Sequence, residues 1–157
     1  MRRPNRSAEF SAIHDTNNAR GAGVIVICTS TKRILLGKRG LLGSNPETWA
    51  PFGGMVDDTD TSENMAARRE LHEEAGLFLA EDQVSNLPVY VNYGSNGFRF
   101  FTFAAFLNYE PQVTINEESS GYAWFRINEI GDLPLHPGFK ELVLSDEWEG
   151  IVPLLVK

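Results

Sequence analysis

The chain is poor in cysteine, with Cys28 as its only one among 157 residues. A single thiol cannot form an internal disulfide, which excludes the small disulfide-stapled domains of secreted proteins. Its neighbours are apolar and β-branched, so we expect Cys28 in a buried strand. The cysteine content therefore favours a reducing compartment and predicts a cytoplasmic protein.

Positive charge and long apolar runs are also scarce. Lysine and arginine together number 14 against 21 acidic residues, for a net charge of −7. Phosphate-backbone binding needs a basic surface, so this balance argues against a general nucleic-acid partner. The longest apolar run, 24–28, is far shorter than the roughly 20 residues that span a bilayer, and the N-terminus is polar. We expect neither a membrane nor a secretory segment.

The length favours one compact domain with a real core. We expect residues 1–20 to form a polar N-terminal segment and residues 21–157 a single domain. Apolar, aromatic and β-branched runs predict the strands, and a helical spacing after Pro137 predicts a terminal helix. The predicted strands are 21–30, 33–38, 88–93, 98–107 and 121–125, with the terminal helix at 136–146. Strands on either side of one long helix predict an α/β fold, an α/β/α sandwich with a mixed sheet.

The stretch 62–76 has the clearest helical pattern in the chain. Ser62 is a good N-cap, and Gly76 is the residue type that ends helices in the left-handed region. Along this helix Glu70, Glu73 and Glu74 fall within an arc of about 100°. Ala67, Leu71 and Ala75 form the apolar stripe beside that arc. One edge of the helix should therefore be buried while the other gathers negative charge.

Carboxylates crowded on one helical turn repel each other, whereas a helix built only for solubility would interleave lysines at i+4. A hard divalent cation such as Mg²⁺ or Mn²⁺ takes oxygen ligands and removes that repulsion. A solvated acidic face is the plainer interpretation of three glutamates alone. The residues around them decide between the two.

The run Arg69-Glu70-Leu71-x-Glu73-Glu74-x-Gly76-Leu77, preceded by Gly53-Gly54 and an acidic loop, resembles the signature of the Nudix hydrolases. That signature is usually written G-x5-E-x7-R-E-U-x-E-E-x-G-U, with U aliphatic. The helical half matches at every position within the box Gly54–Leu77. The loop half has Asp60 where the pattern has glutamate, and one extra residue before Arg69. The insertion leaves the roles of Asp57, Asp58 and Asp60 open.

The resemblance implies specific roles for residues of this chain. It implies that Glu70, Glu73 and Glu74 bind Mg²⁺ or Mn²⁺, and that Arg69 positions Glu73. One of these glutamates, or Glu117 or Glu118 on the loop before a Trp-Phe strand, would activate the water. The expected site residues are catalytic Glu73, Glu70, Arg69 and Glu118, with Gly53, Gly54, Lys38 and Arg39 contacting the substrate.

The implied activity is Mg²⁺-dependent hydrolysis of the pyrophosphate bond of a nucleoside diphosphate linked to another moiety. A nucleoside triphosphate, as for MutT-like enzymes, or a nucleotide sugar is favoured. Two alternatives stay open: a GDP-sugar hydrolase that attacks the sugar carbon, and a Nudix-like ligand-sensing domain without catalysis. The expected partner is a small nucleotide-type substrate, and the oligomeric state, including a homodimer, is undecided.

Overall fold

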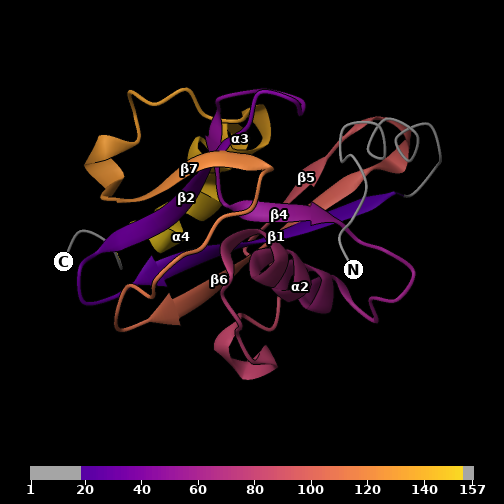
Figure 1. The fold of residues 1–157 in the computed structure, drawn as a ribbon, viewed down its shortest axis with the longest axis horizontal. Helices are drawn as coiled ribbons and strands as arrows, with labels where there is room; N and C mark the ends of the chain where they lie inside the picture. Colours follow the sequence, from indigo (N-terminus) through magenta and orange to yellow (C-terminus); the bar gives the residue numbers. More distant parts are fainter. Residues whose placement is uncertain (1–18, 154–157) are drawn as a thin grey trace.

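The computed structural model describes residues 19–153. A seven-stranded mixed sheet forms its centre, with helices on both faces (Figure 1). The strands are β1 Arg20–Cys28, β2 Arg33–Arg39, β3 Trp49–Ala50, β4 Phe52–Met55, β5 Tyr90–Tyr93, β6 Arg99–Leu107 and β7 Ser119–Phe125. The helices are α2 Glu63–Ala75, α3 Pro137–Val143 and α4 Asp146–Ile151, with short 3₁₀ turns η1 Glu81–Gln83, η2 Ser95–Gly97 and η3 Ile127–Glu129. The expected N-terminal segment lies almost wholly outside the described residues.

Strand β1 is the spine of the sheet. It runs parallel to β6 along its whole length, pairs antiparallel with β4 at its start and antiparallel with β2 at its end. Strand β2 then leaves β1 and pairs with β3 and β7. Strands β1 and β2, and likewise β5 and β6, are consecutive antiparallel pairs that form hairpins.

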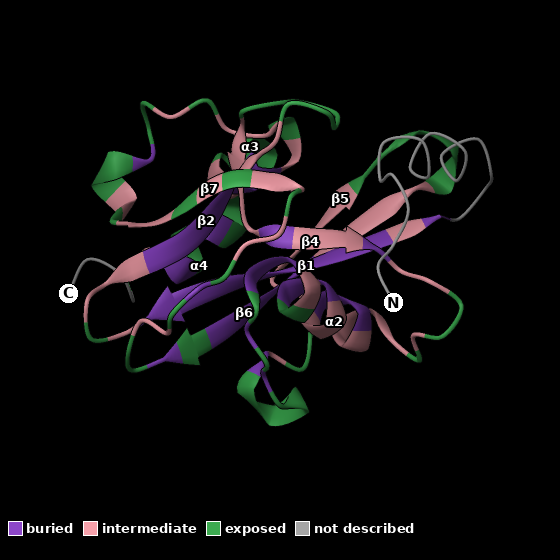
Figure 2. Cartoon of the chain, in the orientation of Figure 1, coloured by how far each residue is buried: buried purple, intermediate pink, exposed green. Residues whose placement is uncertain are grey.

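Alternate residues of β1 face opposite sides of the sheet, as the two-residue period of a strand requires. Val24 and Val26 pack with the apolar stripe of α2, whereas Ile25 and Ile27 pack with α3 and α4. Figure 2 shows the buried residues concentrated in these central strands. The α/β/α sandwich predicted from the sequence is confirmed.

Helix α2 has the ends that the sequence predicts. The Ser62 hydroxyl oxygen accepts a hydrogen bond from the Met65 N–H at 3.1 Å. Gly76 has a φ of 71° and donates its N–H to the His72 carbonyl, which closes the helix in the left-handed region. These two caps fix where the glutamate-bearing turn begins and ends.

The predicted terminal helix 136–146 is wrong in its length, because it breaks into α3 and α4. The Ser145 hydroxyl and N–H both donate to the Leu142 carbonyl, which ends α3. Helix α4 begins at the next residue, and its Trp148 ring packs edge-on against Phe139 of α3. Within residues 19–153 no helix is both long and apolar enough to cross a bilayer.

Gly53 of β4 lies opposite Gly23 of β1 in the antiparallel pairing of the two strands. A Cβ atom on Gly53 would stand 2.6 Å from the Ala22 carbonyl oxygen and 2.8 Å from the Gly23 Cα. Both neighbours are backbone atoms, so they cannot move aside as a side chain could. Close strand packing therefore gives Gly53 a structural reason to be glycine.

Candidate active site

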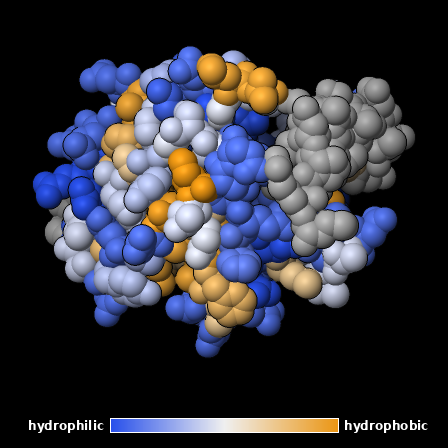
Figure 3. Space-filling view, in the orientation of Figure 1, coloured by the Kyte–Doolittle hydropathy of each residue, from blue (hydrophilic) through white to orange (hydrophobic). Residues whose placement is uncertain are grey.

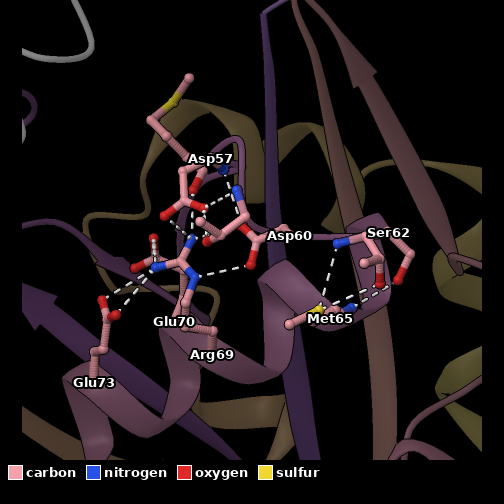
Figure 4. A network of polar contacts seen from close by, with 10 residues as sticks. Asp57, Asp60, Ser62, Met65, Arg69, Glu70 and Glu73 are labelled. Carbon is pink, nitrogen blue, oxygen red and sulfur yellow. Dashed lines mark hydrogen bonds and ion pairs between the residues drawn. The ribbon is translucent and has the colours of Figure 1, made fainter.

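The Arg69 guanidinium on α2 is the centre of a network of carboxylates (Figure 4). Its Nε and Nη2 donate to the two Asp60 oxygens at 3.0 and 2.9 Å. Its Nη1 donates to Glu70 at 3.2 Å and to Glu73 at 3.1 Å. Asp57 lies 3.6 Å from Nη2, so one guanidinium contacts four carboxylates. The expected i, i+4 ion pair between Arg69 and Glu73 is present.

The burial of this network strengthens its electrostatics. The side chains of Asp60 and Glu70 are 0% exposed, and that of Arg69 is 20% exposed. Burial alone would lower the pKa of Arg69, but its hydrogen bonds to Asp60 and Glu73 outweigh burial and raise that pKa. Arg69 is therefore a permanent positive charge that holds the acidic side chains in place.

The inserted loop before α2 folds back on itself. The Asp57 N–H donates to an Asp60 oxygen at 2.9 Å, and both the N–H and the hydroxyl of Thr59 donate to Asp57. The turn presents the Asp60 carboxylate to Arg69 as a bidentate partner, the strongest geometry for an arginine and a carboxylate. In this structure Asp60 anchors Arg69, a role that the sequence left open.

Glu74 faces a different neighbour from Glu70 and Glu73. One of its carboxylate oxygens accepts the Gly53 N–H at 3.3 Å, and the residue is 6% exposed. Because Gly53 lies on β4, this bond joins the glutamate turn to the glycine pair. The structure thus brings together Gly53 and the three glutamates predicted for the site.

The loop before β7 reaches the same turn of α2 through Asn116. The Asn116 side chain donates to the Glu73 backbone carbonyl at 3.1 Å and to the Glu118 carboxylate at 3.3 Å. Glu118 therefore lies beside the glutamate turn, whereas Glu117 is exposed. Sequence reasoning missed Asn116, whose only signal was its place two residues before Glu118.

Lys38 and Arg39 end β2, next to the loop that carries Glu118. The Gly40 N–H donates to the Glu118 carbonyl at 3.0 Å. Arg39, however, turns into its own loop and donates from Nε to the Ser44 carbonyl and from Nη2 to the Ser44 hydroxyl. Lys38 lies 4.0 Å from Glu47. Substrate contact by these two residues stays a prediction.

The loop 40–48 that Arg39 holds is strongly exposed and carries an apolar tip (Figure 3). Leu41 and Leu42 are 71% and 92% exposed. At the base of the loop, the Asn45 amide lies 3.4 Å from His136 Nε2, and His136 Nδ1 accepts the Gly138 N–H at 3.0 Å. Burial, with the charge of Arg39, lowers the pKa of His136 to about 4. His136 therefore connects this loop to α3 as a neutral ring.

The carboxylates of Glu70, Glu73 and Glu74 are the donor type that Mg²⁺ and Mn²⁺ prefer, and they lie on one turn of α2. Within residues 19–153, however, no three acidic, histidine or cysteine side chains are arranged to hold a metal ion. Arg69 binds Glu70 and Glu73, while Glu74 lies against β4. The donor chemistry fits a divalent cation, and in the structure Arg69 holds two of the three donors.

A mixed-sheet sandwich in which a glutamate-bearing turn of α2 contacts the glycine pair of β4 defines a Nudix-type fold. A model of the NUDIX domain matches residues 17–145. The chain therefore belongs to the Nudix family, whose members typically use a divalent metal ion.

Comparison with known proteins agrees with this assignment. Two Mycobacterium tuberculosis strains have a protein named "Putative 8-oxo-dGTP diphosphatase 3" that is 34% identical over 112 residues, covering 69% of this chain and 51% of that protein. The chain thus spans about half the length of these curated relatives. A Nudix hydrolase from M. smegmatis, RenU, superposes with a TM-score of 0.68 at 26% identity, covering 90% and 91% of the two chains.

A more distant structure shares the fold alone. It is described as MutT in work on Aliivibrio salmonicida and Vibrio cholerae, and it aligns with a TM-score of 0.67 at 16% identity. The alignment covers 86% of this chain and 97% of the other.

We expect Asp60→Asn to lower the free energy of unfolding by about 2 kcal/mol, because it removes charge-assisted hydrogen bonds to a mostly buried arginine. Asp58→Asn is the matched control, since Asp58 is exposed in the same loop. Urea denaturation of both variants measures the difference. Equal stability of the two variants would show that Asp60 does not anchor Arg69.

The lowered pKa of His136 predicts acid sensitivity. At pH values above the ordinary pKa of 6.5, His136 is neutral in both the folded and the unfolded chain. Between pH 6.5 and about 4 the unfolded chain binds a proton that the folded one does not, so stability falls as the pH falls.

His136→Asn retains an acceptor for the Gly138 N–H but does not titrate. Melting temperatures should therefore drop less from pH 7 to pH 4.5 in this variant than in the wild type. His72→Asn, a change at an exposed histidine, is the control and should follow the wild type. A wild-type pH profile in His136→Asn would contradict a half-buried ring that stays neutral in the folded chain.

Proposed function

We propose that this chain hydrolyses the pyrophosphate bond of a nucleoside diphosphate linked to another moiety, with a nucleoside triphosphate as the first candidate. The observation that carries the proposal is the turn of α2 that bears Glu70, Glu73 and Glu74, with Glu74 against the β4 backbone. Arg69 ties two of these glutamates, and the Gly53 N–H holds the third.

The relatives support the substrate class. The M. tuberculosis proteins are named for an oxidised deoxyguanosine triphosphate, and they share 34% identity with the part of this chain that they cover. The name of the relatives favours the triphosphate.

Glu70, Glu73 and Glu74 would hold the divalent cation. The cation would neutralise negative charge on the phosphate oxygens as the anhydride bond breaks. Arg69 keeps Glu70 and Glu73 oriented, and Asp60 keeps Arg69 oriented. Glu118, beside the same turn, would accept a proton from the attacking water or orient it. Lys38, next to the Glu118 loop, would contact the substrate phosphates as a point charge.

Direct attack by water fits the types of residue in this site. Glu70, Glu73, Glu74 and Glu118 are carboxylates, and within residues 19–153 the side chains that bind Arg69 are carboxylates too, not serine or cysteine nucleophiles. Replacing a cation-binding glutamate with glutamine removes the charge but keeps the shape of the side chain, so activity should be lost while the fold is retained. Glutamine variants therefore test the proposal.

We expect Glu73→Gln and Glu74→Gln each to lower kcat by about 100-fold or more in the presence of Mg²⁺, because a neutral amide is a weak cation ligand. The melting temperature should hold or rise in Glu74→Gln, because repulsion between neighbouring carboxylates is relieved, and should fall slightly in Glu73→Gln, which loses its ion pair with Arg69. The assay resolves products from nucleoside triphosphates, including 8-oxo-dGTP, and from nucleotide sugars.

Glu81→Gln is the control, an exposed glutamate on η1 away from this turn. Near-normal kcat in Glu73→Gln and Glu74→Gln at saturating Mg²⁺ would refute the cation assignment. Nucleotide binding by the wild type without any product would favour a ligand-sensing domain instead.

A further inference from the structure

The segment 113–116 closes the C-terminal end of α2. Val113 is buried in the core beneath the helix, and the Thr114 N–H donates to the Ala75 carbonyl at 3.0 Å. The last carbonyls of a helix have no partner within it and need donors from elsewhere. Asn116 supplies one of these donors, because its side-chain amide binds the Glu73 carbonyl at 3.1 Å.

The same Asn116 amide also binds Glu118 twice. Its Nδ2 donates to the Glu118 carboxylate at 3.3 Å, and its Oδ1 accepts the Glu118 N–H at 3.0 Å. One half-buried side chain therefore contacts the backbone of the Glu73 turn, the backbone of Glu118 and the carboxylate of Glu118.

Glu118 is held from its other side as well. Its carbonyl accepts the Gly40 N–H at 3.0 Å, at the point where β2 ends. With its N–H on Asn116 and its carbonyl on Gly40, the Glu118 backbone is tied to both α2 and β2. These backbone hydrogen bonds do not fix the direction of the Glu118 carboxylate, because a glutamate side chain has several rotatable bonds.

We propose that Asn116 is a positioning residue, which directs the Glu118 carboxylate towards the Glu73 turn through its Nδ2 donor. The inference rests on the proposed function, in which Glu118 acts on the attacking water. Misplacing a catalytic group by about 1 Å can cost on the order of 100-fold in rate. The Asn116 amide binds both the Glu73 carbonyl and the Glu118 carboxylate, so it would prevent this misplacement of Glu118 by acting on Glu118 alone.

The test separates the Nδ2 donor from the Oδ1 acceptor with two variants. Asn116→Asp keeps the acceptor for the Glu118 N–H and the shape of the side chain, but it removes the donor. Asn116→Ala removes both. Asn92→Ala is the matched control, because Asn92 also donates to a backbone carbonyl, that of Gly138, and to a carboxylate, that of Glu141.

We expect kcat to fall about tenfold in both Asn116 variants while KM changes less than about threefold, and to stay at the wild-type value in Asn92→Ala. Glu118→Gln should lower kcat by about 100-fold. Adding Asn116→Ala to Glu118→Gln should cost little more, because Asn116 acts through Glu118. Hydrogen exchange supplies a readout without turnover: the Glu118 amide should stay protected in Asn116→Asp and lose protection in Asn116→Ala.

The failures of the two proposals are distinguishable. A wild-type kcat in Glu118→Gln would remove Glu118 from the mechanism and overturn the inference with it. A slow Glu118→Gln combined with a wild-type kcat in Asn116→Asp would overturn the inference alone. If the reductions in kcat caused by Asn116→Ala and Glu118→Gln multiply in the double variant, the inference is also overturned, because Asn116 would then act independently of Glu118.

Discussion

The rest of this site depends on the hydrogen bonds and ion pairs that the Arg69 guanidinium makes with the carboxylates around it. A guanidinium with five N–H donors in a fixed plane can bind several carboxylates at once, which a lysine cannot. Arg69 uses that plane to join the inserted loop through Asp60, the helix through Glu70 and Glu73, and β4 through the Met55 carbonyl at 2.9 Å. Three segments that could move separately are thereby fixed relative to one another.

This arrangement explains how the loop accommodates an extra residue. The insertion lies before the capped start of α2, so the register of the glutamates on the helix is unaffected. The extra residue falls between Asp60 and the capped start of α2 at Ser62, and Asp60 still reaches Arg69. A loop tolerates length at low entropic cost, whereas a helix would rotate its carboxylates away from β4.

Local signals made much of the fold and part of the site predictable from the sequence. Ser62 and Gly76 marked the ends of α2, and strand alternation gave the sandwich. Contacts between distant segments were not predictable. The bond from Asn116 to Glu73 spans 43 residues. This contact has no local pattern, because it depends on how the loop before β7 packs against α2.

The proposed function depends on water attacking a phosphorus atom of a substrate bound at the glutamate turn. Hydrolysis of a nucleoside triphosphate and of a GDP-sugar in ¹⁸O-labelled water, with Mg²⁺, tests it most directly by mass spectrometry of the products. The account predicts that the label enters a phosphate group and that a nucleoside monophosphate is formed. Label on a sugar hydroxyl, with an intact nucleoside diphosphate as the other product, would contradict it.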